Sequence, residues 1–372
     1  MKIIINALPI RSPLTGVGNY TYNLITQFKR LRPDFDYTYY YGYFAKKLKF
    51  YPDKGKSFYY IKEFVKKLPI LSSNARDVIN KFAYLHSEKY DLYFEPNFIP
   101  FDIRAEKTVT TVYDFSFYLH PEWHPKERVD YYSKNFFKRI KKSDAIITIS
   151  KYVEKETQEI LKVKDSKIIT IYPGYSEVFN SGGNEPKKIP FPGNYILFVG
   201  SIEPRKNLVN LLRAYVLLPE YMRKEFKLLL VGFKGWENKE IAELLGQLKG
   251  AVNYLGYVNS EELANLYRGA SCFIYPSLYE GFGLPPLEAM ACGCPVVVSN
   301  VTSLPEVCKD AAHYVDPYDV ENMAEGMYKV LVDEGMRQTL IQKGLQRAQL
   351  FNWEKSAQEH LKVFEEVFNS SR

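Results

Sequence analysis

The residues best suited to chemistry lie in a glycine- and proline-rich segment, Glu280-Gly281-Phe282-Gly283-Leu284-Pro285-Pro286-Leu287-Glu288. It follows a predicted strand, Cys272–Pro276, and begins a predicted helix, Leu284–Cys292. Glycines let the backbone approach a ligand, and exposed N–H groups at a helix start favour an anion. A rise of about 1.5 Å per helical residue separates the carboxylates of Glu280 and Glu288 by roughly 10 Å. That separation suits two ends of one extended ligand better than a shared metal ion.

Two adjacent cations, Arg205 and Lys206, follow another predicted strand, Tyr195–Gly200. Adjacent basic residues are usually solvated surface, and such surface charges contribute little. Here they stand between a buried strand and the next helix, where the guanidinium fork and the ammonium group can clamp a diphosphate. The position after the strand therefore favours a binding role.

A third glycine-containing turn, Pro13–Tyr20, lies between the first predicted strand and a helix. Gly16 and Gly18 partly imitate a dinucleotide-binding fingerprint, but Thr21 replaces the third glycine. No acidic residue ends a following strand at the spacing of an NAD site. The turn alone indicates no particular ligand.

Alternating strands and helices must position these segments. The expected strands form two series: Lys2–Leu8, Asp36–Tyr43, Asp91–Glu95, Thr108–Tyr113, Ala145–Ser150 and Ile168–Tyr172, then Tyr195–Gly200, Lys227–Gly232, Asn253–Gly256, Cys272–Pro276, Pro295–Ser299 and His313–Val315. Helices are expected between most of them, including Ser260–Gly269 and Asp319–Glu334. This alternation predicts βαβ units and parallel sheets. We therefore predict an α/β protein with two Rossmann-like domains, whose ligand lies at the strand carboxyl ends facing the cleft between them.

The domain boundary is predicted near residue 185, in the turn-rich segment Asn180–Pro190. The first domain would span 1–180 and the second 190–352. The charge balance changes sign at the same place, from +11 over residues 1–190 to −4 over residues 191–372. No finger, homeodomain or RNA-recognition signature accompanies the basic half, so we expect no nucleic-acid partner.

Other patterns exclude further classes. No stretch approaches the roughly 18 apolar residues of a membrane-spanning helix, and Met1–Asn6 is typical of a strand rather than a signal peptide. Asp34 and Asp36 match the Asp-x-Asp string of metal-dependent transferases, but the string belongs to a predicted turn at Arg32-Pro33, just before the second expected strand. The cysteines, which lack zinc-ligand spacing, are Cys272, Cys292, Cys294 and Cys308. We expect reduced thiols, no bound metal and a cytoplasmic location.

Together these segments resemble the retaining glycosyltransferases of family 4, which have the GT-B fold. The likeness covers nearly the whole chain. In the second half it is specific and rests on the Glu280–Glu288 element, Glu203–Asn207 and Ala291–Val297. The first half matches more loosely, through Gly16–Tyr20, Val112–Asp114, Pro121–Trp123 and Ile147–Ser150. Phe351–Trp353 and the helix after it, about 355–372, resemble the family's end, where the last helix returns to the first domain.

The resemblance implies a nucleotide-diphosphate sugar as co-substrate. The implied donor-binding residues are Gly16, Gly18, Arg205, Lys206, Tyr257, Val258, Glu280, Gly281, Phe282, Gly283, Leu284 and Glu288, and the implied catalytic residues are Asp114, Arg205, Lys206 and Glu280. Arg205 and Lys206 would bind the diphosphate, Glu280 the transferred sugar and Glu288 the ribose hydroxyls. Tyr113 stands where many members carry a histidine that contacts the donor sugar.

The resemblance also implies retaining, metal-independent transfer to a glycan or lipid-linked acceptor in surface-polysaccharide assembly. GDP-mannose is the expected donor, because the motifs look most like the family's mannosyltransferases. A UDP-sugar donor, a GT-B sugar-nucleotide epimerase and a non-catalytic nucleotide-sugar binder are the alternatives. Cationic and aromatic residues mix in Phe44–Leu71 and Tyr131–Lys142. They predict contact with an anionic membrane surface, the alternative being a solvated surface over core aromatics.

Overall fold

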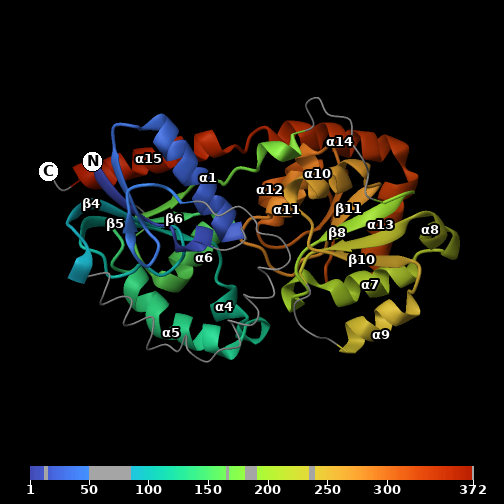
Figure 1. Ribbon diagram of the computed structural model, residues 1–372. Coiled ribbons are helices and arrows are strands. Elements are labelled where there is room, and N and C mark those ends of the chain that lie inside the picture. The colour runs from blue at the N-terminus through green and yellow to red at the C-terminus, as the bar shows by residue number, and fades with distance from the viewer. Residues whose placement is uncertain (12–15, 50–84, 165–166, 181–190, 234–238, 371–372) are drawn as a thin grey trace. The chain divides into compact units, whose positions relative to one another are not determined.

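The computed structural model describes residues 1–11, 16–49, 85–164, 167–180, 191–233 and 239–370 (Figure 1). The chain divides into two compact units, Met1–Pro173 with Trp353–Arg372, and Gly174–Asn352. The division falls several residues before the linker predicted near residue 185, of which 181–190 lie outside the described residues. Phe179 explains the difference, because its ring is buried against Tyr267 and its carbonyl accepts a bond from the Cys292 thiol. The segment before the predicted linker is thereby held in the second unit.

The first unit is built on a sheet with strand order β3-β2-β1-β4-β5-β6-β7. Its strands are β1 (Lys2–Asn6), β2 (Asp36–Tyr40), β3 (Phe44–Ala45), β4 (Tyr90–Glu95), β5 (Ala105–Val112), β6 (Ala145–Thr148) and β7 (Ile168–Thr170). β2 and β3 pair antiparallel, and the other neighbours pair parallel. The short β3 was not predicted. Strand interiors such as Ile3–Ile5 are fully buried, as both faces of a parallel sheet require.

The helices among the described residues of the first unit are α1 (Gly16–Leu31), α4 (Ser116–Leu119), α5 (Lys126–Ile140), α6 (Lys151–Leu161) and α15 (Trp353–Asn369). The final helix, α15, begins at Trp353, slightly before the predicted residue 355. It packs on α1, β4 and β5, and Figure 1 shows α15 in red beside α1 in blue. Among the described residues, none of the helices has the length and apolar character needed to cross a membrane.

A buried histidine joins α15 to α1. His360 has no exposed surface, and its Nδ1 lies 2.7 Å from the Ser356 carbonyl oxygen. Since a carbonyl only accepts, Nδ1 carries the proton and Nε2 accepts from the Tyr20 hydroxyl at 2.7 Å. Burial lowers the pKa of His360 to about 4. Burial therefore keeps the imidazole of this helix contact neutral at neutral pH.

This histidine predicts a loss of stability in acid. The unfolded chain binds a proton at the ordinary histidine pKa near 6.5, whereas folded His360 binds one only near pH 4. The contribution of His360 to the free energy of unfolding is therefore present above pH 6.5 and is lost as the pH falls. Between about pH 7.5 and 5 the loss is about 2 kcal/mol. Urea unfolding should show this extra pH dependence in the wild type and not in His360→Gln; equal pH dependence in both would contradict it.

The second unit contains a fully parallel sheet with strand order β10-β9-β8-β11-β12-β13 among the described residues. Its strands are β8 (Tyr195–Val199), β9 (Lys227–Val231), β10 (Val252–Gly256), β11 (Cys272–Tyr275), β12 (Val296–Ser299) and β13 (His313–Val315). Its helices are α7 (Leu208–Leu217), α8 (Glu220–Glu225), α9 (Lys239–Gln247), α10 (Ser260–Gly269), α11 (Leu284–Ala291), α12 (Leu304–Cys308), α13 (Val320–Val332) and α14 (Glu334–Ala348). The prediction of two parallel-sheet α/β units is confirmed.

Two features of the second sheet position its polar loops. β8 and β11 are neighbours, so the loops that follow them leave the same edge of the sheet. Gly232, after β9, has a φ of +144°, and a Cβ there would lie 2.1 Å from the Gly200 carbonyl oxygen. The close approach holds the backbone after β8 against that after β9. It therefore fixes where the loop toward residues 203–206 begins.

Candidate active site

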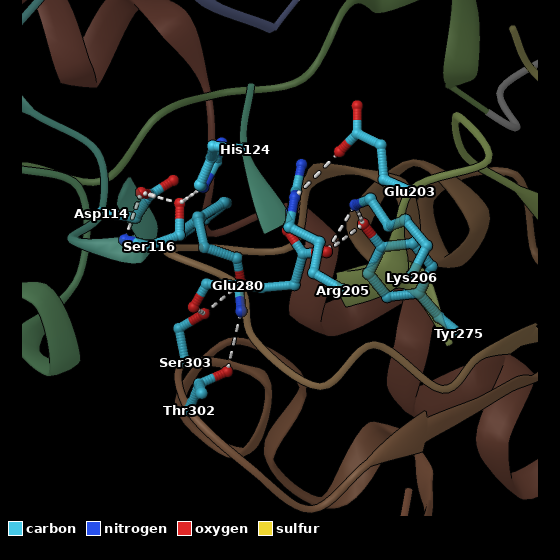
Figure 2. Close-up of polar contacts among 11 residues, drawn as sticks. Asp114, Ser116, His124, Glu203, Arg205, Lys206, Tyr275, Glu280, Thr302 and Ser303 are labelled. Atoms are coloured by element: carbon cyan, nitrogen blue, oxygen red, sulfur yellow. Dashed lines mark hydrogen bonds and ion pairs between the residues drawn. The ribbon is translucent and has the colours of Figure 1, made fainter. Parts of the chain in front are cut away.

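Arg205, Lys206 and Glu280 form an ion cluster in the second unit (Figure 2). Lys206 and Glu280 are buried, and Arg205 is partly exposed. The two cations lie in a short 3-10 helix, Pro204–Lys206, after β8, and the carboxylate lies in the loop after β11. Glu280 Oε2 is 3.0 Å from Arg205 Nη1, and Oε1 is 2.5 Å from Lys206 Nζ. The structure thus brings together two predicted segments that are far apart in the chain.

The charges of this cluster depend on one another. Burial by itself opposes ionisation of Glu280, but Lys206 and Arg205 outweigh it and lower the pKa of Glu280 to about 2. Burial and the neighbouring Arg205 charge lower the pKa of Lys206, while Glu280 raises it. Glu280 is therefore an anion at any physiological pH, and its charge supports the protonated state of Lys206.

Other side chains hold the cluster in place, and the motifs of the sequence did not indicate them. The Tyr275 hydroxyl lies 2.9 Å from Glu280 Oε1 and 2.5 Å from Lys206 Nζ. The Glu280 N–H donates to Thr302 Oγ1 at 3.1 Å, and Ser303 Oγ donates to the Glu280 carbonyl at 2.8 Å (Figure 2). The available signal was position, because Tyr275 lies next to the end of the predicted strand Cys272–Pro276, and Thr302 and Ser303 follow the next predicted strand.

The glycine segment leads into α11 as predicted. Gly283 precedes the helix with a φ of +109°, and a Cβ there would lie 2.7 Å from a methyl of Leu304. Prolines occupy the first turn, where a missing N–H costs little. The N–H groups of Gly283 and Leu284 thus lie at the positive end of α11. Gly281 and Phe282 are buried, and the Phe282 ring packs edge-on against Phe351 with centroids 5.6 Å apart.

Glu288 lies within α11 and is half-buried. Burial raises the pKa of this carboxyl to about 8. The two glutamates of the motif therefore differ in electrostatics, since Glu280 is held as an anion by its cations and Glu288 is not. An uncharged carboxyl that can donate and accept suits hydroxyl groups better than phosphates.

Tyr257 and Val258 follow β10, which lies two strands from β8 in the sheet. The Tyr257 ring is exposed and stacks on Phe233, with centroids 4.9 Å apart and planes at 19°. An exposed aromatic stack at a strand carboxyl end suits contact with a flat ring system. These two residues thus lie apart from the ion cluster along the sheet edge.

The remaining predicted residues belong to the first unit. Gly16 and Gly18 lie in the first turn of α1. Asp114 follows β5, and its Oδ1 accepts bonds from the N–H and the hydroxyl of Ser116 at 2.9 and 2.7 Å. Ser116 Oγ is in turn 2.9 Å from His124 Nε2 (Figure 2). The Tyr113 hydroxyl donates to the Pro96 carbonyl at 2.5 Å, so its bond is to the backbone.

Two parallel-sheet α/β units, one carrying cations and a carboxylate beside a glycine-led helix, define a protein of the GT-B class. Solved structures share the fold. Sucrose-phosphate synthase from Thermosynechococcus elongatus matches with a TM-score of 0.70 and 19% identity over the whole of both chains. WaaG, a glycosyltransferase involved in lipopolysaccharide biosynthesis, matches with a TM-score of 0.67 and 15% identity over 98% of this chain and 99% of that one.

Sequence comparison identifies the family to which the chain belongs. The model of the family "Glycosyl transferases group 1" matches residues 183–347. The chain is 35% identical to O-antigen chain mannosyltransferase B of Escherichia coli, across 95% of this chain and 97% of that protein. It is 31% identical to O-antigen chain mannosyltransferase RfbU of Salmonella typhimurium, across 48% and 49%. The chain belongs to the group 1 glycosyltransferases.

Proposed function

We propose that this glycosyltransferase moves mannose from GDP-mannose to a hydroxyl of a glycan or lipid-linked saccharide during surface-polysaccharide assembly, at the cytoplasmic face of a membrane. The Arg205–Lys206–Glu280 cluster carries the proposal of a diphosphate donor. The choice of mannose is supported by the Escherichia coli relative, which is named a mannosyltransferase and aligns along nearly the whole chain.

The chemistry requires charge stabilisation at two places. As the bond from the anomeric carbon to the phosphate oxygen breaks, positive charge develops on the carbon and negative charge on the departing diphosphate. Arg205 and Lys206, with the N–H groups at the start of α11, would stabilise the diphosphate. Glu280 would bind the sugar and support the charge of Lys206. These cations supply the positive charge that other transferases take from a metal, so we propose that no metal is needed.

Retention of configuration follows from attack on the face that the leaving group occupies. The acceptor oxygen forms a bond to the anomeric carbon as the bond from that carbon to the phosphate oxygen breaks. An oxygen of the leaving phosphate takes the proton of the acceptor hydroxyl. No enzymic nucleophile is required in this scheme. Asp114, at the carboxyl end of β5, is the first-unit carboxylate that we propose for the acceptor side.

Lys206 has one more N–H donor than the partners it contacts in the cluster, and this donor can meet a phosphate. Lys206 has three N–H groups, of which two meet Tyr275 and Glu280. Arg205 has five, and its bonds include Nε to Glu203 at 3.1 Å and Nη1 to Glu280 at 3.0 Å. A diphosphate can therefore join the cluster without displacing Glu280.

Thermal unfolding with nucleotide sugars tests the donor. GDP-mannose at about 100 times its Kd should stabilise the protein by about 2.7 kcal/mol, in the presence of EDTA. UDP- and ADP-sugars should stabilise it less. A larger shift with a UDP-sugar would contradict the GDP-mannose assignment, and dependence on a divalent metal would contradict metal independence. Conversion of the donor without an acceptor would instead indicate an epimerase, and binding without nucleotide release a non-catalytic binder.

In the structure, fewer residues support the predicted contact with an anionic membrane than the sequence suggested. Most of Phe44–Leu71 lies outside the described residues. Tyr131–Lys142 falls mainly on α5, where Phe136 is fully buried and the neighbouring aromatics pack in the same core. Exposed lysines remain on this segment, namely Lys134, Lys138, Lys141 and Lys142. The proposed contact therefore rests on lysines rather than on a cationic–aromatic mixture.

A further inference from the structure

We propose that Tyr275 is a positioning residue for glycosyl transfer, whose hydroxyl directs the Lys206 ammonium toward the donor diphosphate. This inference rests on the proposed function, in which Lys206 binds that diphosphate. Tyr275 lies outside the motifs of the sequence, in a strand that is fully buried. Its role emerges from where its hydroxyl lies in the folded second unit.

The phenol links the two charged groups of the cluster (Figure 2). Tyr275 is the last residue of β11 and has no exposed surface. Lys206 Nζ lies 2.5 Å from its hydroxyl oxygen, and that hydroxyl lies 2.9 Å from Glu280 Oε1. An ammonium group only donates and a carboxylate only accepts, so the phenol accepts from Lys206 and donates to Glu280. The hydroxyl proton of Tyr275 therefore points toward Glu280.

Lys206 Nζ also contacts Glu280 Oε1 directly at 2.5 Å, which closes a triangle of three polar atoms. The same Nζ lies 4.7 Å from the centroid of the Tyr275 ring. Phe273 stacks on that ring at 5.7 Å and 27°, which restricts its rotation. Two of the three N–H groups of Lys206 are therefore directed at Tyr275 and Glu280. Because these two bonds fix the orientation of the ammonium group, the direction of the third N–H is fixed as well.

This restraint matters because lysine is otherwise a flexible ligand. Its side chain has four rotatable bonds, and a point-charge ammonium group has no preferred plane. Lys206 is only 7% exposed, so no water shell orients it. With the phenol hydroxyl removed, Glu280 would remain as its acceptor, and the ammonium group could rotate about that one contact. A less directed N–H weakens the bond to the phosphate.

A purely structural role for the hydroxyl is the competing explanation, and Tyr195 is a matched control for it. Tyr195 lies in the neighbouring strand β8, is equally buried, and donates its hydroxyl to the Leu266 carbonyl at 2.8 Å. Tyr195→Phe and Tyr275→Phe each delete one buried hydroxyl and keep the ring. Loss of a buried hydrogen bond affects stability in both, whereas only Tyr275 contacts the cluster.

The experiment measures binding of GDP and of UDP by calorimetry, donor and acceptor KM, kcat, and urea unfolding for the two variants. Tyr275→Phe should weaken binding of the preferred nucleotide about 10-fold and lower kcat/KM for the donor by at least as much. Acceptor KM should stay unchanged. Tyr195→Phe should bind the nucleotide and turn over as the wild type does, with a comparable loss of stability.

Unchanged nucleotide affinity and kcat/KM in Tyr275→Phe would overturn the inference, and so would an equal loss of affinity in Tyr195→Phe. A Lys206→Ala variant separates this failure from that of the proposed function. If Lys206→Ala binds GDP and UDP as the wild type does, the proposed diphosphate site is itself wrong, and the inference is overturned with it. If Lys206→Ala loses affinity and Tyr275→Phe does not, only the inference is wrong.

Discussion

Replacing Glu280 with glutamine is expected to lower kcat/KM for the donor by about 10²–10³-fold, a loss typical of deleting one charge-stabilising group. The amide has the shape of the carboxylate but no charge. It therefore removes the attraction that raises the pKa of Lys206, while burial and Arg205 continue to lower it. Lys206 then loses its proton more readily, and the site loses two charges through one substitution.

The pH dependence of this variant distinguishes that explanation from simple loss of a sugar contact. A lysine with a lowered pKa regains its proton as the pH falls, so the residual kcat/KM of Glu280→Gln should rise as the pH is lowered. Glu203→Gln is a matched control, since Glu203 pairs with Arg205 at the more exposed side of the cluster. A partly exposed ion pair contributes up to about 1 kcal/mol of interaction free energy. The substitution Glu203→Gln should therefore lower kcat/KM by less than about 6-fold. Near-normal turnover of Glu280→Gln would show that the site assignment is wrong.

Lys206→Ala is expected to abolish measurable transfer while the fold survives. The departing diphosphate would lose its buried cation, and removing such a group costs about 10²–10³-fold or more. The fold should persist because Arg205 still pairs with Glu280 at 3.0 Å, so the carboxylate keeps a counter-charge. Lys206→Met retains the volume and apolar stem of lysine and should be equally inactive. If both variants are equally inactive, the cause is the lost charge and not the lost packing of the side chain.

Initial rates of nucleotide release with donor and acceptor, together with urea unfolding, measure both parts of this expectation. Lys227→Met provides the control, because Lys227 begins β9 at the end of the strand opposite the site. That variant should turn over normally. If Lys206→Met retained wild-type kcat/KM, Lys206 could not be the residue that stabilises the leaving diphosphate.

Much of the fold could be predicted because its signals are local. Apolar runs such as Ile196–Val199 mark strands buried on both faces, and β8 occupies that place. Asn259 and Glu262 form the capping box at the start of α10, which begins at the predicted residue Ser260. The domain boundary was less accurate, because the position of Phe179 depends on its packing against Tyr267 in a distant helix.

The site was predictable to the extent that it follows strand ends. Arg205, Lys206 and Glu280 each come after a buried strand, and the adjacency of β8 and β11 places them together. Their position near strand ends was the only signal for the side chains that support Glu280, and their contacts with Glu280 were not predictable. Thr302 and Ser303 reach it from the loop after β12, and such contacts depend on register and loop geometry rather than on any local pattern.

The sequence by itself determined the two series of strands, the glycine-led helix and the charged residues that we propose bind a diphosphate. Periodicity and turn chemistry act over a few residues and can be recognised locally. Only the tertiary structure decided the charge states. Glu280 and Glu288 belong to one motif, yet nearby cations lower one pKa to about 2 and burial raises the other to about 8. Desolvation and Coulomb energy depend on distances between groups far apart in the chain, and those distances exist only after folding.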